Sequence, residues 1–198
     1  MTQQPASTHR AQPGAEGATG RTVEQRGLWF EEYEEGVTYL HRPGRTVTEA
    51  DNTLFTTLTM NTQPLHLDAA WAAAQPGFRG ERLVNSMFTL STVVGLSVTQ
   101  LTLGTIVANL GFKEIKFPHP MFHGDTLYVE TECVSKRRSK SRPHQGIVEL
   151  RHIGRNQDGE VVCEAVRNTL LQCDPAREKA ETADGGAGGG DDSEARQR

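Results

Sequence analysis

The segment from Leu83 to Phe112 contains no charged residue. A run of this length could cross a membrane as a helix. Polar side chains interrupt it throughout, however, namely Ser86, Thr89, Ser91, Thr92, Ser97, Thr99, Gln100, Thr102, Thr105 and Asn109. That density of hydroxyl and amide groups is typical of a buried helix of a soluble protein that runs into a strand. We therefore predict no membrane span and no association with a membrane.

The first half of this uncharged segment has helical periodicity. Apolar residues after Ser86 recur at intervals of three and four, which is the pattern of one buried helix face. They are Met87, Leu90, Val94, Val98 and Leu101. The sequence therefore predicts a long helix that begins near Ser86.

The segments after Gly104 have the patterns of β-strands. Apolar and small residues alternate with polar ones from 126 to 134, and the apolar set falls on one face of a strand. The segments 146–155 and 160–173 flank Asp158-Gly159, a strong signal for a hairpin turn. One long helix followed by antiparallel strands predicts an α+β domain, in which a curved antiparallel sheet wraps around the helix.

The segment before the long helix is expected to contain one strand and two short helices. Residues 37–47 alternate as a strand does. Thr48 is a plausible N-cap for a helix over 49–60, because Glu49 and Asp51 follow it in the first turn. Residues 66–74 predict a second short helix, stopped by a Pro-Gly pair.

Composition separates a folded middle from two polar ends. Residues 1–27 and 174–198 are rich in Gly, Ala, Gln and charged residues, so we expect disordered tails. The folded unit is expected over 28–173 as a single domain. The first 27 residues contain no apolar signal-peptide core, which favours a cytoplasmic protein.

Net charge, cysteine spacing and histidine spacing indicate which binding partners and metals can be expected. The formal net charge is -4 and the isoelectric point is near 6.0, so no overall basic field predicts binding to nucleic acid or an anionic membrane. The three cysteines have no C-x-x-C spacing, and we interpret them as free thiols in a reducing compartment. His119 and His123 lie in an extended, proline-flanked context without an evident third ligand, so we expect no metal.

Three motifs in a fixed order resemble a known family. They are "NTQPLHLD", then "LVNSM" at the start of the long helix, then "FPHPMFHGDTLYVETECV". This order resembles the MaoC-like dehydratases, the (R)-specific enoyl-CoA hydratases of the hotdog fold. "TMNTQPLHLD", "NQDGEVV" and "KRRSKSRPHQGIV" are most similar to hydratases of branched dicarboxylic acyl-CoAs such as itaconyl-CoA or mesaconyl-CoA.

The resemblance implies a single hotdog domain that adds water to an α,β-unsaturated acyl-CoA thioester. It also implies a homodimer or a multiple of dimers, with the site at the subunit boundary. No cofactor is expected, because coenzyme A enters as part of the substrate. A hotdog thioesterase and a non-catalytic acyl-CoA-binding protein remain the alternatives.

The family motif G-D-x-N-P-x-H falls on Met60, Asn61, Gln63 and His66, so only the proline and the histidine are retained. His66 is the expected acid/base, because an imidazole with a pKa of about 6.5 can take a proton from water and return one to Cα. Asn61 cannot act as a base. It is expected to position the water, to cap the preceding helix, or both.

The resemblance assigns the remaining site residues. "NSM" stands where the family has His-Gly-Met, so the backbone N–H of Ser86 is expected to polarise the thioester carbonyl, and its hydroxyl could instead cap the helix. Gln63 and Asn85 are expected to contact substrate. Arg82 is chosen as the candidate for a distal carboxylate; Arg45 and Arg79 are equally within sequence reach.

A basic segment provides the candidate phosphate contacts. "SKRRSKSRP" contains five basic residues and no acid. Lys136, Arg138 and Arg142 are expected to contact the phosphates of coenzyme A. The alternative is a solvated hairpin loop whose charges protect an edge strand.

Overall fold

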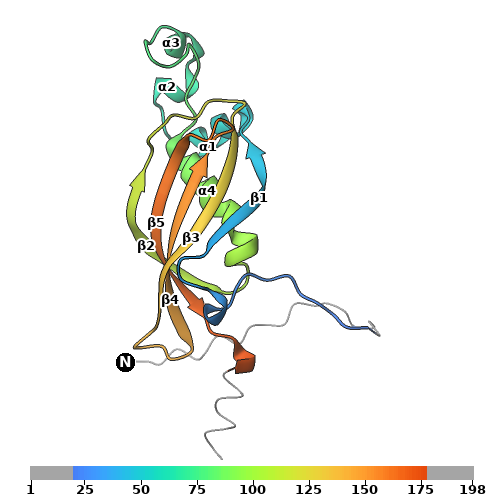
Figure 1. The fold of residues 1–198 in the computed structure, drawn as a ribbon. Coiled ribbons are helices and arrows are strands. Elements are labelled where there is room, and N and C mark those ends of the chain that lie inside the picture. The colour runs from blue at the N-terminus through green and yellow to red at the C-terminus, as the bar shows by residue number, and fades with distance from the viewer. Residues whose placement is uncertain (1–19, 178–198) are drawn as a thin grey trace, which may run out of the picture.

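The computed structural model describes residues 20–177, and its central element is a five-stranded antiparallel sheet in the order β1-β3-β4-β5-β2. Figure 1 shows the sheet curved around one long helix, α4. The strands are β1 (Thr38–Thr46), β2 (Ile106–Lys116), β3 (Thr126–Arg138), β4 (Gln145–Arg155) and β5 (Val161–Gln172). The helices are the 3-10 turn η1 (Phe30–Glu32), α1 (Glu49–Leu58), α2 (Pro64–Leu67), α3 (Ala69–Ala73) and α4 (Ser86–Leu101). The predicted α+β class and the sheet wrapped around a long helix are confirmed.

The side chains that alternate toward the inside along the central strands form the core. In β4, every second residue is buried from Gly146 to Gly154. In β3, Leu127, Val129, Thr131 and Cys133 are buried, as the alternation predicts. These side chains meet α4 in two apolar clusters, one near each end of the helix. The tight turn Asp158-Gly159 joins β4 to β5, with Gly159 at φ 81°, a conformation that suits glycine.

The buried face of α4 differs from the predicted one. Met87 is 46% exposed, while Thr89, Thr92 and Ser97 are buried. Thr92 donates to the Phe88 carbonyl at 2.9 Å and Ser97 to the Val94 carbonyl at 2.7 Å. Hydroxyl groups satisfied within the helix can be buried without an unpaired donor. The predicted face is therefore right for Leu101, which is fully buried, and for Leu90, which packs against the core, but wrong for Met87, and it omits the buried hydroxyl residues.

The segment between β1 and α4 contains the short helices α1, α2 and α3. Thr48 caps α1 by accepting from the Asp51 N–H at 3.2 Å, and Asp51 in turn accepts from the Thr48 N–H at 2.9 Å, so the predicted cap is confirmed. The predicted helix over 66–74 is two short helices instead. Asp68 separates them with extended backbone, and its side chain accepts from the Trp71 N–H to start α3.

Hydrogen bonds connect the segments on either side of the domain to it. The Gly27 N–H donates to the Leu103 carbonyl at 2.8 Å, and the Asp174 N–H donates to the Glu31 carboxylate at 2.9 Å. Most of the two predicted tails, 1–19 and 178–198, lies outside the described residues. Within 20–177, no helix has the length and apolar character needed to cross a membrane. The three cysteines are buried and form no disulfide with one another.

Candidate functional site

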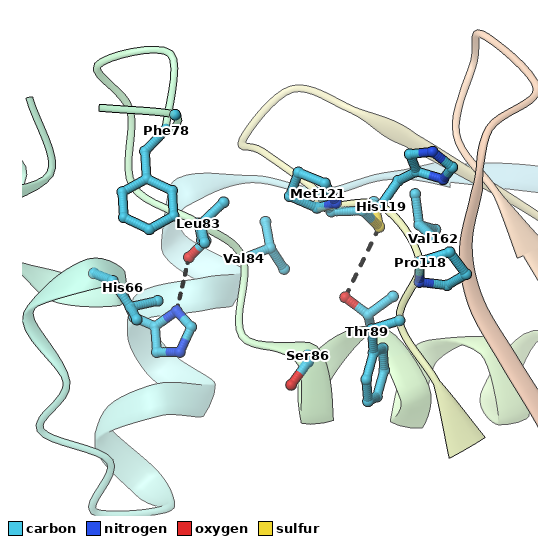
Figure 2. Close-up of a pocket in the computed structure, with 14 residues that line it drawn as sticks. His66, Phe78, Leu83, Val84, Ser86, Thr89, Pro118, His119, Met121 and Val162 are labelled. Atoms are coloured by element: carbon cyan, nitrogen blue, oxygen red, sulfur yellow. Dashed lines mark hydrogen bonds between the residues drawn. The ribbon is translucent and has the colours of Figure 1, made fainter. Parts of the chain in front are cut away.

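A pocket of about 500 Å³ lies between α2, the start of α4 and the segment that joins β2 to β3. Its polar side chains are His66, Ser86, Thr89 and His119, and its walls include Phe78, Val84, Met121 and Val162. Figure 2 shows His66 on one wall and Ser86 on the neighbouring one, at the terminus of α4. The structure thus brings together two of the three predicted catalytic residues, although they are twenty positions apart in the sequence.

His66 is held so that one ring nitrogen is committed to the backbone. Its Nδ1 lies 3.0 Å from the Leu83 carbonyl oxygen, the contact drawn in Figure 2. A carbonyl oxygen only accepts, so this contact assigns the proton to Nδ1 and leaves the lone pair on Nε2. Pro64, at the first position of α2, fixes the backbone turn that presents the ring. The ring is therefore arranged as a general base.

Asn52 connects the pieces of this site, and the sequence reasoning missed it. Its side chain is fully buried, and its amide nitrogen lies 3.1 Å from the Leu83 carbonyl, 3.3 Å from the His66 carbonyl and 3.0 Å from His123 Nε2. Its two N–H groups are therefore shared among these three acceptors. Its Oδ1 accepts from the Asn85 N–H at 2.8 Å. Asn52 therefore joins α1, the His66 segment and the start of α4. Hydrophobic patterning could not identify it, because the buried face of α1 carries Asn52 and Thr56 while Leu54 and Leu58 are exposed.

Asn85, not Ser86, caps α4. The Asn85 Oδ1 accepts from the Met87 N–H at 3.0 Å, and its Nδ2 donates to the Thr56 hydroxyl at 3.3 Å. The expectation that the Ser86 hydroxyl caps the helix is therefore wrong. Ser86 occupies the first position of the helix, where an N–H has no intrahelical acceptor. The buried Asn85 shapes the helix start, and its direct contact with substrate stays a prediction.

The loop that holds Asn61 is closed by its own hydrogen bonds. The N–H groups of Met60 and Asn61 donate to the carbonyls of Thr57 and Thr56, both at 3.0 Å, which is a Schellman motif. Its left-handed residue is Met60, with φ 55°, where the family motif has glycine. The proposed left-handed cap at Asn61 is therefore wrong.

The side chain of Asn61 is engaged in the same loop. Its Oδ1 accepts from the Gln63 N–H at 3.0 Å. Among the described residues, neither Asn61 nor Gln63 lines the pocket. Their roles toward water and substrate stay predictions that the geometry of the single chain does not favour.

The three candidate arginines lie outside the pocket lining. Arg82 pairs with Glu49 and donates to the Leu67 carbonyl at 3.4 Å. Arg45 pairs with Asp51, and the Arg79 guanidinium lies 4.9 Å from the centre of the Phe122 ring. The pKa of His123 is lowered, first by burial and second by the positive charge of Arg82. In this structure these arginines stabilise the surroundings of the site.

The basic segment lies at the other end of β3. Lys136 donates to the Glu31 carbonyl at 3.1 Å, and Arg138 pairs with the Glu31 carboxylate at 2.9 Å. Both cations also lie over the Phe30 ring. Arg142 is exposed in the loop between β3 and β4, at the end of the sheet opposite α2 and α3 in Figure 1. Within one chain, these residues therefore do not meet the pocket.

The side chains of His119 and His123 form hydrogen bonds with different parts of the structure. His119 Nδ1 contacts the Val161 carbonyl at 3.0 Å, whereas His123 Nε2 contacts the Asn52 amide nitrogen at 3.0 Å. Over residues 20–177, no group of three His, Cys, Asp or Glu side chains is placed to hold a metal ion.

Comparison with known proteins gives a consistent family. A family model described as "MaoC like domain" matches residues 31–156. The chain is 31% identical to beta-methylmalyl-CoA dehydratase of Chloroflexus aurantiacus over 146 residues, covering 74% of this chain and 40% of that protein. It is 33% identical to mesaconyl-CoA hydratase of Haloarcula hispanica over 170 residues, covering 85% of this chain and 45% of that protein. The chain thus spans less than half the length of these curated relatives.

Solved structures give the fold. A MaoC-like dehydratase from Rhodospirillum rubrum superposes with a TM-score of 0.66 at 28% identity, covering 75% of this chain and 99% of that one. A Mycobacterium tuberculosis protein with a double hotdog fold superposes with a TM-score of 0.67 at 24% identity, covering 77% of this chain and 46% of that one. The sheet and helix of the chain form the predicted hotdog fold.

Proposed function

Because the chain belongs to the MaoC-like domain family, we propose that it is a hydro-lyase that adds water reversibly to the double bond of an α,β-unsaturated acyl-CoA thioester. The observation that carries this proposal is His66. Its Nδ1 is fixed by the Leu83 carbonyl, and its ring opens onto a pocket that also contains the start of a long helix. A hydratase needs a base for water, an acid for Cα and a donor for the enolate oxygen.

His66 supplies the two proton transfers. As the water oxygen forms its bond to Cβ, Nε2 takes a proton from the water, and the electron pair of the double bond moves through Cα onto the thioester oxygen. The resulting imidazolium then returns a proton to Cα, the enolate collapses to the thioester, and His66 is neutral again. Hydrogen and hydroxyl have been added, and no oxidant or metal takes part in these steps.

The start of α4 stabilises the enolate. The Ser86 N–H has no intrahelical acceptor, and the positive end of a sixteen-residue helix favours negative charge at this point. The thioester oxygen placed there gains charge in the transition state and loses it in the product. This placement also orients the double bond toward His66.

The proposed substrates are short, branched dicarboxylic acyl-CoAs of the itaconyl or mesaconyl type. Two relatives whose names state such activities support this choice, and the pocket volume is suited to a short acyl group. The substrate would bring coenzyme A with it, and no further cofactor is invoked.

We also propose that the protein is a homodimer or a multiple of dimers. Strand β2 is at the edge of the sheet, and most of its residues are exposed, including Leu110 at 50% and Phe112 at 37%. An uncovered apolar edge strand favours pairing with another strand. In a dimer, Lys136, Arg138 and Arg142 of a second copy are the proposed contacts for the phosphates of coenzyme A.

The test is hydration of itaconyl-, mesaconyl- and crotonyl-CoA by the wild-type protein and by His66→Ala. Turnover of a dicarboxylic thioester is expected, with loss of activity in His66→Ala and retention in the control His144→Ala, which changes an exposed histidine in the β3–β4 loop. Release of the free coenzyme A thiol would instead identify a thioesterase. Thioester binding without turnover would identify a non-catalytic binding protein.

A further inference from the structure

The attacking water needs a second contact besides His66. One of its O–H groups points to the base and one lone pair points to Cβ, which leaves the second O–H without an acceptor. A water held by His66 alone can rotate about that contact, and the loss of orientation lowers the rate. The site therefore requires another acceptor on the pocket wall near His66.

The obvious candidate is occupied elsewhere. Asn61 stands where the family motif has its carboxylate, yet its Oδ1 accepts from the Gln63 N–H and it does not line the pocket. Two other polar side chains on the wall, Thr89 and His119, lie further from His66 in the view of Figure 2, on the far side of Ser86. The Thr89 hydroxyl is directed to the Asn85 carbonyl at 3.4 Å, and His119 is held at the Val161 carbonyl.

We infer that the side-chain hydroxyl of Ser86 holds the attacking water beside His66; this inference rests on the proposed hydratase function. Among the residues from 20 to 177, no hydrogen-bond partner is found for this hydroxyl, although Ser86 lines the same pocket as His66. In Figure 2 it extends from the start of α4 on the side where His66 lies.

The position of Ser86 in the helix explains why its hydroxyl is available. Ser91 donates to the Met87 carbonyl at 2.8 Å, and Thr92 donates to the Phe88 carbonyl at 2.9 Å, so hydroxyl groups later in α4 bond back to the preceding turn. Ser86 is the first residue of the helix and has no helical turn behind it. The remaining local use, capping, is taken by Asn85.

The two polar groups of Ser86 then have separate tasks. The N–H meets the thioester oxygen, and the hydroxyl oxygen accepts from the water that attacks Cβ. Glycine, which the family motif has at this position, supplies only the first contact. The replacement by serine thus provides an acceptor in the chain that lacks the carboxylate at position 61.

Ser86→Ala and Ser86→Gly test this inference, because both keep the backbone N–H and remove the hydroxyl. Loss of one hydrogen bond to the reacting water is expected to lower kcat about tenfold. KM for the thioester and the melting temperature should change little. Ser86→Thr, which keeps a hydroxyl, should recover most of the activity. Asn61→Ala should retain kcat within about threefold, since its lost contact is in the turn.

The outcomes separate this inference from the proposed function. If the wild type hydrates the thioesters and His66→Ala does not, while both Ser86 variants keep the wild-type kcat, the assignment to Ser86 is wrong. An inactive but fully folded Asn61→Ala would return the water to Asn61. A wild-type protein that hydrates no thioester would overturn the hydratase function itself, and the Ser86 assignment with it.

Discussion

Replacing Asn52 with alanine is expected to damage both the stability and the activity of the protein. The fully buried side chain donates to the Leu83 and His66 carbonyls and accepts from the Asn85 N–H. Alanine removes these contacts, so at least the Asn85 N–H and the His66 carbonyl lose the Asn52 amide as a hydrogen-bond partner. Each buried group that loses its partner costs about 1–3 kcal/mol, so we expect a loss of about 2–6 kcal/mol.

The same contacts make the effect on activity specific. The Leu83 carbonyl holds the His66 ring, and Asn85 caps the helix whose first N–H, that of Ser86, is the proposed donor to the thioester. Without Asn52, the His66 segment and the start of α4 lose the side chain that connects them. We therefore expect kcat to fall even at a temperature where the variant is fully folded. Urea unfolding followed by circular dichroism gives the change in free energy, and hydration kinetics at low temperature give the change in kcat.

A variant on the same helix provides the control. Thr57 is exposed, and its hydroxyl bonds only within α1, to the Thr53 and Leu54 carbonyls. Thr57→Ala should change the free energy of unfolding by less than about 0.5 kcal/mol and leave kcat unchanged. An Asn52→Ala protein that loses less than about 1 kcal/mol and keeps its kcat would refute the role given to Asn52.

Three further predictions concern pH, the strained turn and the edge strand. Burial, with repulsion from Arg167, sets the pKa of His152 well below its usual value, so below pH about 6.5 the unfolded chain binds a proton that the folded chain does not. The free energy of unfolding, measured with urea, should therefore decrease by about 1.4 kcal/mol for each pH unit by which the pH is lowered below this value. A pH dependence that is unchanged in His152→Gln would contradict this. Met60→Gly should raise the free energy of unfolding by about 0.5–1 kcal/mol, because Met60 is left-handed and 86% exposed, and no gain in a melting assay would mean that the turn is not strained. Phe112→Lys should shift sedimentation toward the monomer, whereas Val23→Lys, exposed outside the sheet, should not; equal behaviour of the two would exclude β2 as the dimer edge.

The strands were predictable because their burial follows the simplest periodicity. Alternation in β3 and β4 depends only on which residue faces the helix, and a two-residue period is unambiguous over ten or more residues. The face of α4 was not predictable in this way. Thr89 and Thr92 can be buried because their hydroxyl groups bond to backbone carbonyls, whereas a hydropathy pattern counts them as polar.

The supporting residues of the site depend on contacts between distant segments. Asn52 acts through Leu83 and Asn85, which are more than thirty positions away, so no local pattern reveals its partners. The division between α2 and α3 has a local cause that the sequence did display. Asp68 is a good N-cap residue, and it ends one helix by starting the next.

The departures from the family motif follow the geometry of the loop. Met60 and Gln63 are exposed, and the Asn61 side chain bonds within the turn, so the three altered positions lie outside the pocket lining. Pro64 and His66, the two retained residues, set the backbone of α2 and line the pocket, respectively. The Schellman motif and the Asn61 turn keep the loop closed without the family's glycine and aspartate. The shape of the loop can therefore survive their loss. In the proposed hydration, the water contact that the family motif assigns to the aspartate comes instead from the Ser86 hydroxyl at the start of α4.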